Sequence, residues 1–120
     1  MADVTIWHNP NCSTSRHAVQ AAEEAGVDVE LRKYMLKAQR PDRPEIVALL
    51  EVLEDPPTDL VRRDAKFRSY GLGDDDVATA EQVADVLAEH PELLQRPVLV
   101  RGDRAIIGRP KDRVGPFLAG

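Results

Sequence analysis

The sequence is poor in cysteine, and Cys12 is the only one among 120 residues. A single cysteine excludes a disulfide framework within the chain, and it excludes a zinc site built on several cysteines. Low cysteine usage without disulfides is typical of proteins from a reducing compartment, so we expect a cytoplasmic location.

Three other features are missing. No apolar run approaches the roughly 20 residues that span a membrane, and the segment Met1–Val4 lacks the basic and apolar stretches of a secretory signal. A basic excess is also missing, because the net charge is −5. Phosphate binding favours a basic face, so we expect no nucleic-acid partner and no membrane partner. The acidic run Asp74–Asp76 is interpreted as a solvated loop.

The residues that are present fit one globular domain. Hydrophobic residues make up 42% of the chain and charged residues 31%, which is typical of a folded protein with a real core. The length suits a single domain over residues 1–120. We expect no bound cofactor and no metal.

The first quarter of the chain predicts a strand, a helix and a second strand. Val4–Trp7 alternates in polarity, turn residues follow, and a helix is expected to begin just after Cys12 and to end at Gly26. The inner face of this helix is predicted to hold Ala18, Val19, Ala22 and Ala25. Alternation at Val27, Val29 and Leu31 then predicts a parallel partner strand, reached by a right-handed crossover.

A helical insertion is expected over about residues 42–92. Asp42–Glu45 has an acidic cap and an early proline, and Thr79 with Gln82 forms a second capping box. Short helical turns are expected over Leu60–Tyr70, between helices that should end at Pro56–Pro57 and at Pro91. The two apolar faces are predicted to hold Ile46, Leu49, Leu50 and Leu53, and Ala80, Val83, Val86 and Leu87.

The end of the chain predicts a hairpin and a last helix. Pro97–Val100 and Ala105–Ile107 are expected strands joined by the turn Gly102-Asp103, and a helix should follow Pro110 and bury Val114, Phe117 and Leu118. This order predicts an α/β protein with a four-stranded mixed sheet flanked by helices, the thioredoxin-like arrangement. The helical insertion would separate its βαβ and ββα halves.

Cys12 is the leading candidate for chemistry because it lies where a strand passes into a helix. The free N–H groups and the dipole of a helix N-terminus favour a thiolate, and such cysteines titrate from about 3.5 to 7.5 instead of about 8.5. The hydroxyls of Ser13, Thr14 and Ser15 can donate to the sulfur, and Ser15 is also a candidate for binding substrate. We predict a reactive thiolate at Cys12.

Basic residues surround this position in the sequence. His8 precedes Cys12 by four residues and Arg16 follows it by four, so both could place positive charge near the sulfur or near an approaching anion. Guanidinium groups bind tetrahedral oxyanions bidentately. The candidates for this role are Arg62, Arg96 and Arg109.

A second cysteine that could resolve a disulfide is missing, because Ser15 occupies the last position of a Cys-x-x-Cys pattern. Any disulfide on Cys12 must therefore involve an outside thiol, such as glutathione or a partner protein.

These motifs together resemble the glutaredoxin-dependent arsenate reductase family. His8–Arg16 matches its His-x-x-x-Cys-x-x-x-Arg pattern, including the Asn-Pro and the Thr-Ser-Arg. Four further segments fall in the order and spacing of that family: Leu60–Arg62, His90-Pro91, Arg96–Val98 and Gly108–Pro110.

The resemblance implies an oxidoreductase of arsenic detoxification that reduces arsenate to arsenite through a covalent thiol–arsenate adduct on Cys12. His8 would lower the pKa of that thiol. The anion-binding arginines would be Arg62, Arg96 and Arg109, and Pro97 would follow a cis peptide bond. Glutathione would be the co-substrate, and a glutaredoxin would remove the mixed disulfide.

Two departures from the family concern the site. Ser13 stands where many members have glycine, which would narrow the anion pocket. The segment from Arg63 to Gly71 is slightly shorter than usual, so Arg62 and Arg63 could exchange roles.

Two other functions remain open at this point. Some relatives of the family are redox-responsive regulators that bind RNA polymerase, although Ser15 argues against a disulfide switch here. A thiol oxidoreductase acting on another oxyanion or on a glutathione adduct is the second alternative. The reductant could also be another low-molecular-weight thiol or a thioredoxin.

Overall fold

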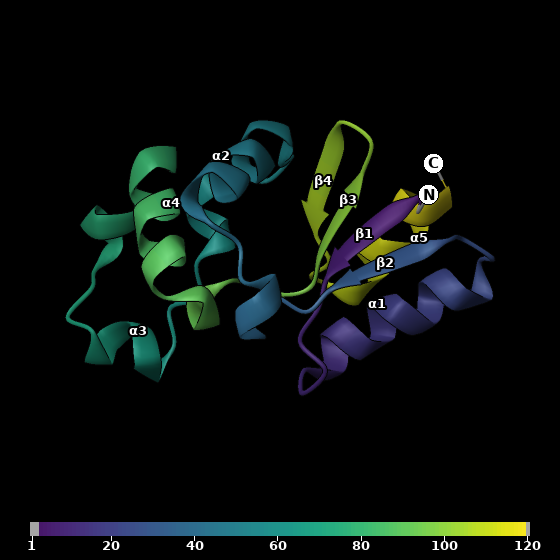
Figure 1. Ribbon diagram of the computed structural model, residues 1–120, viewed down its shortest axis with the longest axis horizontal. Helices are drawn as coiled ribbons and strands as arrows, with labels where there is room; N and C mark the ends of the chain where they lie inside the picture. The colour runs from purple at the N-terminus through teal and green to yellow at the C-terminus, as the bar shows by residue number, and fades with distance from the viewer. Residues whose placement is uncertain (1–2, 120) are drawn as a thin grey trace.

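A four-stranded mixed sheet forms the centre of the protein, whose computed structural model describes residues 3–119 (Figure 1). Met1 and Ala2, which open the segment expected to lack a secretory signal, and Gly120 lie outside the described residues. The strand order is β2-β1-β3-β4, with β1 parallel to β2 and antiparallel to β3. The strands are β1 (Val4–Trp7), β2 (Val29–Arg32), β3 (Val98–Arg101) and β4 (Arg104–Ile107).

Helices cover the sheet from both sides, which completes the thioredoxin-like arrangement that the sequence predicted. In Figure 1, α1 and α5 lie on one side of the sheet, and α2 and α4 lie on the other. The α-helices are α1 (Ser13–Glu24), α2 (Arg43–Val52), α3 (Ala65–Ser69), α4 (Ala80–Glu89) and α5 (Val114–Ala119). Single turns of 3₁₀ helix occur at Lys37–Gln39, Pro57–Leu60, Asp74–Val77, Pro91–Leu93 and Lys111–Arg113.

The predicted helix ends are confirmed by their hydrogen bonds. Asp42 Oδ1 accepts from the Glu45 N–H at 3.0 Å, and Thr79 Oγ1 accepts from the Gln82 N–H at 3.2 Å. Both helices therefore begin with the predicted capping boxes. Gly26 follows the end of α1 with φ +70°, a left-handed conformation that favours glycine.

Two predicted buried positions are wrong. Ala25 is exposed because it caps the C-terminal end of α1, one residue beyond the last helical turn. Ala80 is exposed because it lies in the first turn of α4, and Ala84 is buried one turn later.

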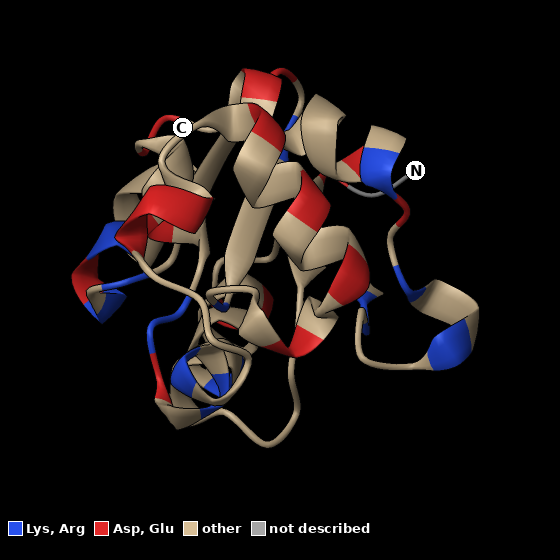
Figure 2. Ribbon diagram, turned by 90° about the vertical axis from the view of Figure 1, so that its left-hand side faces the viewer, with Lys and Arg blue, Asp and Glu red and all other residues tan. Residues whose placement is uncertain are grey.

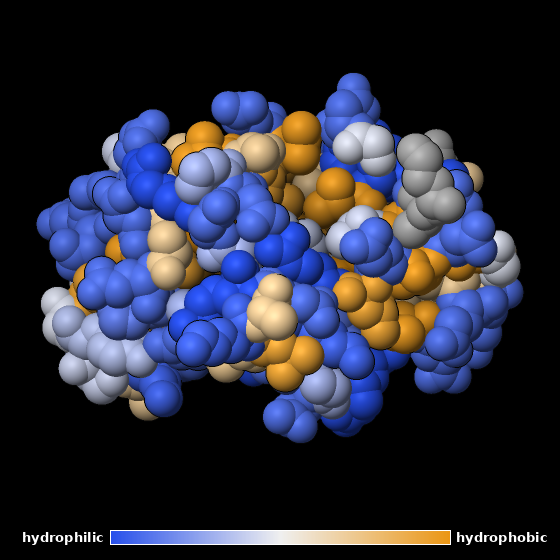
Figure 3. Space-filling view, in the orientation of Figure 1, coloured by the Kyte–Doolittle hydropathy of each residue, from blue (hydrophilic) through white to orange (hydrophobic). Residues whose placement is uncertain are grey.

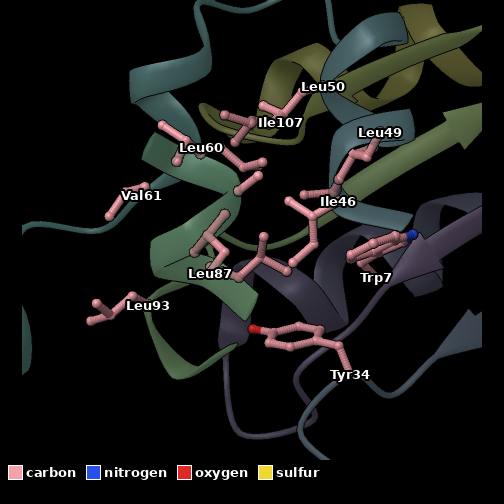
Figure 4. Close-up of a cluster of buried hydrophobic side chains, with 14 of the residues drawn as sticks. Trp7, Tyr34, Ile46, Leu49, Leu50, Leu60, Val61, Leu87, Leu93 and Ile107 are labelled. Atoms are coloured by element: carbon pink, nitrogen blue, oxygen red, sulfur yellow. The ribbon is translucent and has the colours of Figure 1, made fainter. Parts of the chain in front are cut away.

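Two hydrophobic clusters form the core, one on each face of the sheet. Alternation along the strands directs Ile6, Leu99 and Ile106 towards α1 and α5. The neighbouring residues Trp7 and Val98 face the other way, where they pack with the helical stretch (Figure 4). The strands β1, β3 and β4 therefore contribute to both clusters, whereas β2, at the edge of the sheet, contributes Val29 and Leu31 to the cluster under α1 and α5 only.

The helical stretch is tied to the sheet and is also linked internally. Leu53 pairs with Ala105 of β4, and Val61 pairs with Leu94. Arg43, at the start of α2, forms ion pairs with Glu81 and Asp85 of α4, each at 2.6 Å. Acidic residues are prominent on the helices that face the viewer in Figure 2.

The outer surface is mostly hydrophilic on the face shown in Figure 3. Apolar residues show between α2 and the strands, at a groove lined by Thr5, Trp7, Leu49, Val52 and Val100. The run Asp74–Asp76 is exposed as predicted, although it forms a turn of 3₁₀ helix. Between residues 3 and 119 the structure contains no helix with the length and apolar character needed to cross a membrane.

Candidate active site

The turn between β1 and α1 is held by local hydrogen bonds. The Asn11 N–H donates to Asn9 Oδ1 at 2.9 Å, and the Cys12 N–H donates to the Asn9 carbonyl at 3.0 Å. Arg16 Nη1 donates to the Pro10 carbonyl at 2.7 Å. These contacts fix Cys12 as the residue that precedes the first turn of α1.

Cys12 is buried, with 8% of its surface exposed, and its pKa is lowered to about 7. Burial alone would raise the pKa, because it disfavours the charged thiolate. The backbone N–H groups of Ser15 and Thr14 and the guanidinium of Arg96 outweigh that effect by stabilising the thiolate. A lowered pKa of this kind favours the thiolate, in the direction that a helix N-terminus predicts.

Two arginines from the β3–β4 hairpin meet at the sulfur. Arg109 Nη2 donates to Cys12 Sγ at 3.3 Å, and Arg109 Nε donates to the Arg96 carbonyl at 2.6 Å. The Arg96-Pro97 peptide bond is cis, as the family resemblance implied, and the Arg109-Pro110 bond is cis as well. The structure thus brings Arg96 and Arg109 to Cys12 from positions far along the chain.

His8 contacts Ser15 and not the sulfur. Its Nδ1 lies 2.7 Å from Ser15 Oγ, and the same hydroxyl oxygen accepts from the Asn9 N–H at 3.0 Å. Burial lowers the pKa of His8, and the charges of Lys33 and Arg16 lower it further. These surroundings disfavour the imidazolium, and the predicted effect of His8 on Cys12 stays a prediction.

Ser15 is fully buried at the start of α1. Its hydroxyl joins the end of β1 to the helix, while its backbone N–H acts on the Cys12 sulfur. The serine at this position therefore has a structural contact that a resolving cysteine would not reproduce. Arg16 is likewise directed at the turn, where its guanidinium binds the Pro10 carbonyl.

Arg62 and Arg63 differ in their surroundings. Arg63 donates to the carbonyls of Thr58 and Val61, and it pairs with Asp74 at 3.2 Å. Arg62 lies 3.3 Å from Asp64, and its charge acts on the buried Tyr34 hydroxyl, as does that of Arg96. Arg63 also lines a pocket together with Arg109, so the assignment of Arg62 to the anion stays a prediction.

Tyr34 is the residue that the sequence analysis missed. It follows β2 and is fully buried, and the negative charge of Cys12 acts on its hydroxyl. Its position in the sequence could have indicated a role. Tyr34 follows β2, which runs parallel to β1, and functional groups gather at the carboxyl ends of parallel strands.

A metal site is not part of this arrangement. Among residues 3–119, no three His, Cys, Asp or Glu side chains are grouped so that they could hold a metal ion. What the site offers is a partly ionised sulfur beside guanidinium donors. That combination suits nucleophilic attack on the central atom of an oxyanion. The donors stabilise both the thiolate and the negatively charged oxygens of the group that it attacks.

Comparison with known proteins identifies similar chains over nearly the whole length. The ArsC family profile matches residues 7–117. An arsenate reductase of Haemophilus influenzae is 31% identical, with 92% of this chain and 95% of the relative covered. An uncharacterized protein in the glnII region of Streptomyces viridochromogenes is 35% identical over 95% of this chain and 98% of its own.

A solved structure shares both the fold and the sequence. The arsenate reductase from Vibrio cholerae superimposes with a TM-score of 0.82 at 30% identity, and the match covers 94% of this chain and 95% of that one.

Proposed function

Since the chain belongs to the ArsC family, we propose that it reduces arsenate to arsenite with Cys12 as the nucleophile. The observation that carries this proposal is the buried Cys12 sulfur, which accepts a hydrogen bond from Arg109 at 3.3 Å. The names of the Haemophilus influenzae and Vibrio cholerae proteins support arsenate as the oxyanion.

In the first step, the Cys12 thiolate attacks arsenic(V) and an arsenate oxygen leaves as water after taking up protons. A sulfur–arsenic bond forms and no oxidation state changes. In the second step, an outside thiolate attacks the Cys12 sulfur. The sulfur–arsenic bond breaks, its electron pair stays with arsenic, and arsenite leaves while a mixed disulfide forms. A second outside thiol then exchanges with this disulfide and restores Cys12.

The arginines bind the anion in this scheme. Arg109 donates to the sulfur and Arg96 lowers its pKa, and we assign Arg62 as the third anion ligand because its charge acts on Tyr34. Their charges would neutralise arsenate, which otherwise repels a thiolate, and would stabilise the charge on oxygen during attack. Ser15, His8 and Arg16 hold the turn that carries Cys12.

The reductant must come from outside, because Cys12 has no second cysteine with which to close a disulfide. We propose glutathione for the second step and a glutaredoxin for the last, in the cytoplasm, where both thiols are kept reduced. A thioredoxin, or a low-molecular-weight thiol other than glutathione, would reduce the enzyme by the same thiol exchange.

The test is arsenate-dependent oxidation of thiols. Purified protein is mixed with arsenate, glutathione and a glutaredoxin, and arsenite release is measured beside a Cys12→Ser variant. We expect turnover only with Cys12 present, and mass spectrometry should detect glutathione on Cys12 when glutaredoxin is omitted. Arsenite release by Cys12→Ser at the wild-type rate would contradict the proposal. So would a wild type that releases no arsenite with glutathione or with thioredoxin.

A further inference from the structure

Tyr34 is placed by the end of β2, where its N–H donates to the Arg32 carbonyl at 3.0 Å. Its ring packs in the core with Trp7, Ile46 and Leu87, and Figure 4 shows the ring lying below these side chains with its hydroxyl turned away from Trp7. The ring is therefore an ordinary part of the core, and a phenylalanine would fill the same space.

The hydroxyl of Tyr34 is not explained by packing. It is fully buried and has no hydrogen-bond partner of regular geometry among residues 3–119. The Asn9 side chain makes only a weaker hydrogen-bonding contact with it, which lowers its pKa. Buried hydroxyls without a partner are rare, because they lose hydrogen bonds to water and gain none. An unpartnered buried donor of this kind points to a partner that arrives from outside the chain.

A second unpartnered donor faces the same site. Arg96 Nε is buried and also lacks a hydrogen-bond acceptor among the described residues, while the guanidinium of Arg96 acts on Cys12. Positive charge from Arg96 and Arg62 reaches the Tyr34 hydroxyl, and so does the negative charge of Cys12. Two buried donors without an acceptor thus belong to residues whose charges act on one another and on Cys12.

The Tyr34 hydroxyl remains protonated near neutral pH. Burial raises its pKa, and the Cys12 thiolate raises it too, whereas Arg96, Asn9 and Arg62 act in the opposite direction. A protonated hydroxyl can donate to an anion without adding positive charge.

We propose that the Tyr34 hydroxyl and Arg96 Nε donate hydrogen bonds to oxygens of the oxyanion bound at Cys12, which makes Tyr34 a substrate-binding residue. This inference rests on the proposed function only in requiring that a tetrahedral oxyanion occupies the site. The Tyr34 hydroxyl acts on the anion and not on the thiolate.

The test separates anion binding from catalysis. Alkylation of Cys12 by iodoacetamide is followed at increasing arsenate, and in parallel at increasing phosphate, with no reductant present. Tyr34→Phe is compared with the wild type and with Tyr70→Phe, a matched control whose exposed hydroxyl binds Glu92. Thermal melts and the pH dependence of alkylation are recorded for all three proteins.

We expect Tyr34→Phe to need about 10- to 100-fold more anion for the same protection, because a hydrogen bond to a charged group is lost. Tyr70→Phe should match the wild type. The melting temperature of Tyr34→Phe should not fall, since a buried hydroxyl without a partner is removed, whereas a merely structural tyrosine would lose stability.

Three results would overturn the inference. The first is equal protection of Tyr34→Phe and the wild type. The second is a raised alkylation midpoint with unchanged anion protection, which would assign the hydroxyl to the thiolate. The third is a wild type that neither arsenate nor phosphate protects. A wild type that is protected but releases no arsenite with any thiol counts against the proposed function alone, and the comparison of the tyrosine variants still decides the role of Tyr34.

Discussion

Arg109 lies against Cys12, with its Nη2 donating to Sγ over 3.3 Å, while its Nε is held by the Arg96 carbonyl. One guanidinium therefore links the sulfur to the strand end that supplies the second arginine. Because Nη2 already points at the reacting atom, little rearrangement is needed for it to meet an anion that approaches the sulfur.

Replacing Arg109 with alanine should raise the pKa of Cys12 above about 7, because a donor to the thiolate is removed. Anion affinity should fall by about tenfold or more. Both are measured by alkylation of Cys12 with and without arsenate. Arg104→Ala is the matched control, since Arg104 lies on the same hairpin but pairs with Glu54 on the surface. Equal effects of the two variants would contradict the assignment.

The alkylation rate of Cys12 should depend on pH with a midpoint near 7. Only the thiolate reacts, so the rate should fall about tenfold per pH unit below the midpoint and level off above it. The rate is measured by quenching the alkylation at several times and determining the alkylated fraction by mass spectrometry. A midpoint near 8.5, the value of an unperturbed thiol, would show that the N–H groups and Arg96 do not act on the sulfur.

The same ionisation should contribute to stability. The folded state lowers the pKa of Cys12, so this contribution is fully present above about pH 8.5. It is lost as the pH falls through about 7. Urea unfolding at several pH values should therefore give a wild-type free energy of unfolding that rises across this window. The part of this rise that Cys12 contributes should be missing in Cys12→Ser. If the free energy of unfolding depends on pH in the same way in both proteins, the prediction is wrong.

Ser15→Ala should destabilise the protein by about 1–3 kcal/mol, because the Asn9 N–H and His8 Nδ1 would lose their partner in a buried place. Ser13→Ala provides the control, since Ser13 is exposed in the same helical turn, and it should change stability by less than about 0.5 kcal/mol. Urea denaturation measures both variants. An unaffected Ser15→Ala would mean that this hydroxyl does not hold the turn.

Gly108→Ala should also destabilise, by about 1–3 kcal/mol. A Cβ there would lie 2.8 Å from Pro97 Cγ and 2.9 Å from Leu99 Cδ1, both packed inside the hairpin that carries the two site arginines. Gly115→Ala is the control, since a Cβ at Gly115 meets nothing within 4 Å and α5 favours alanine. Thermal melting should separate the two variants, and similar melting temperatures would contradict the close packing.

The elements that the sequence predicted well are those with strong local signals. The capping residues Asp42 and Thr79 begin their helices, and the turn at Gly102 joins the predicted hairpin. That turn also carried a signal about the site. Since Val98 pairs with Ile107, the residues two positions farther out, Arg96 and Arg109, face each other. The convergence of these arginines follows from the hairpin register.

Other features depend on contacts that no local pattern contains. His8 lies four residues from Cys12, but burial and two neighbouring cations disfavour its charge. Arg16 was predicted to place positive charge near the sulfur or near an approaching anion, and the structure adds that its guanidinium donates to the Pro10 carbonyl. Tyr34 stands in no motif, and its importance becomes visible only when the packing leaves its hydroxyl without a partner.

The site draws its cations from two parts of the chain that pack against each other. Arg96 and Arg109 come from the two ends of the β3–β4 hairpin. Arg62 comes from the helical stretch, where its backbone N–H donates to the Leu93 carbonyl at 2.8 Å. An anion bound by all three arginines would link the hairpin to the helical stretch. Opening of the helical stretch by local fluctuation would then release the anion, so occupancy of the site should slow amide hydrogen exchange in α4.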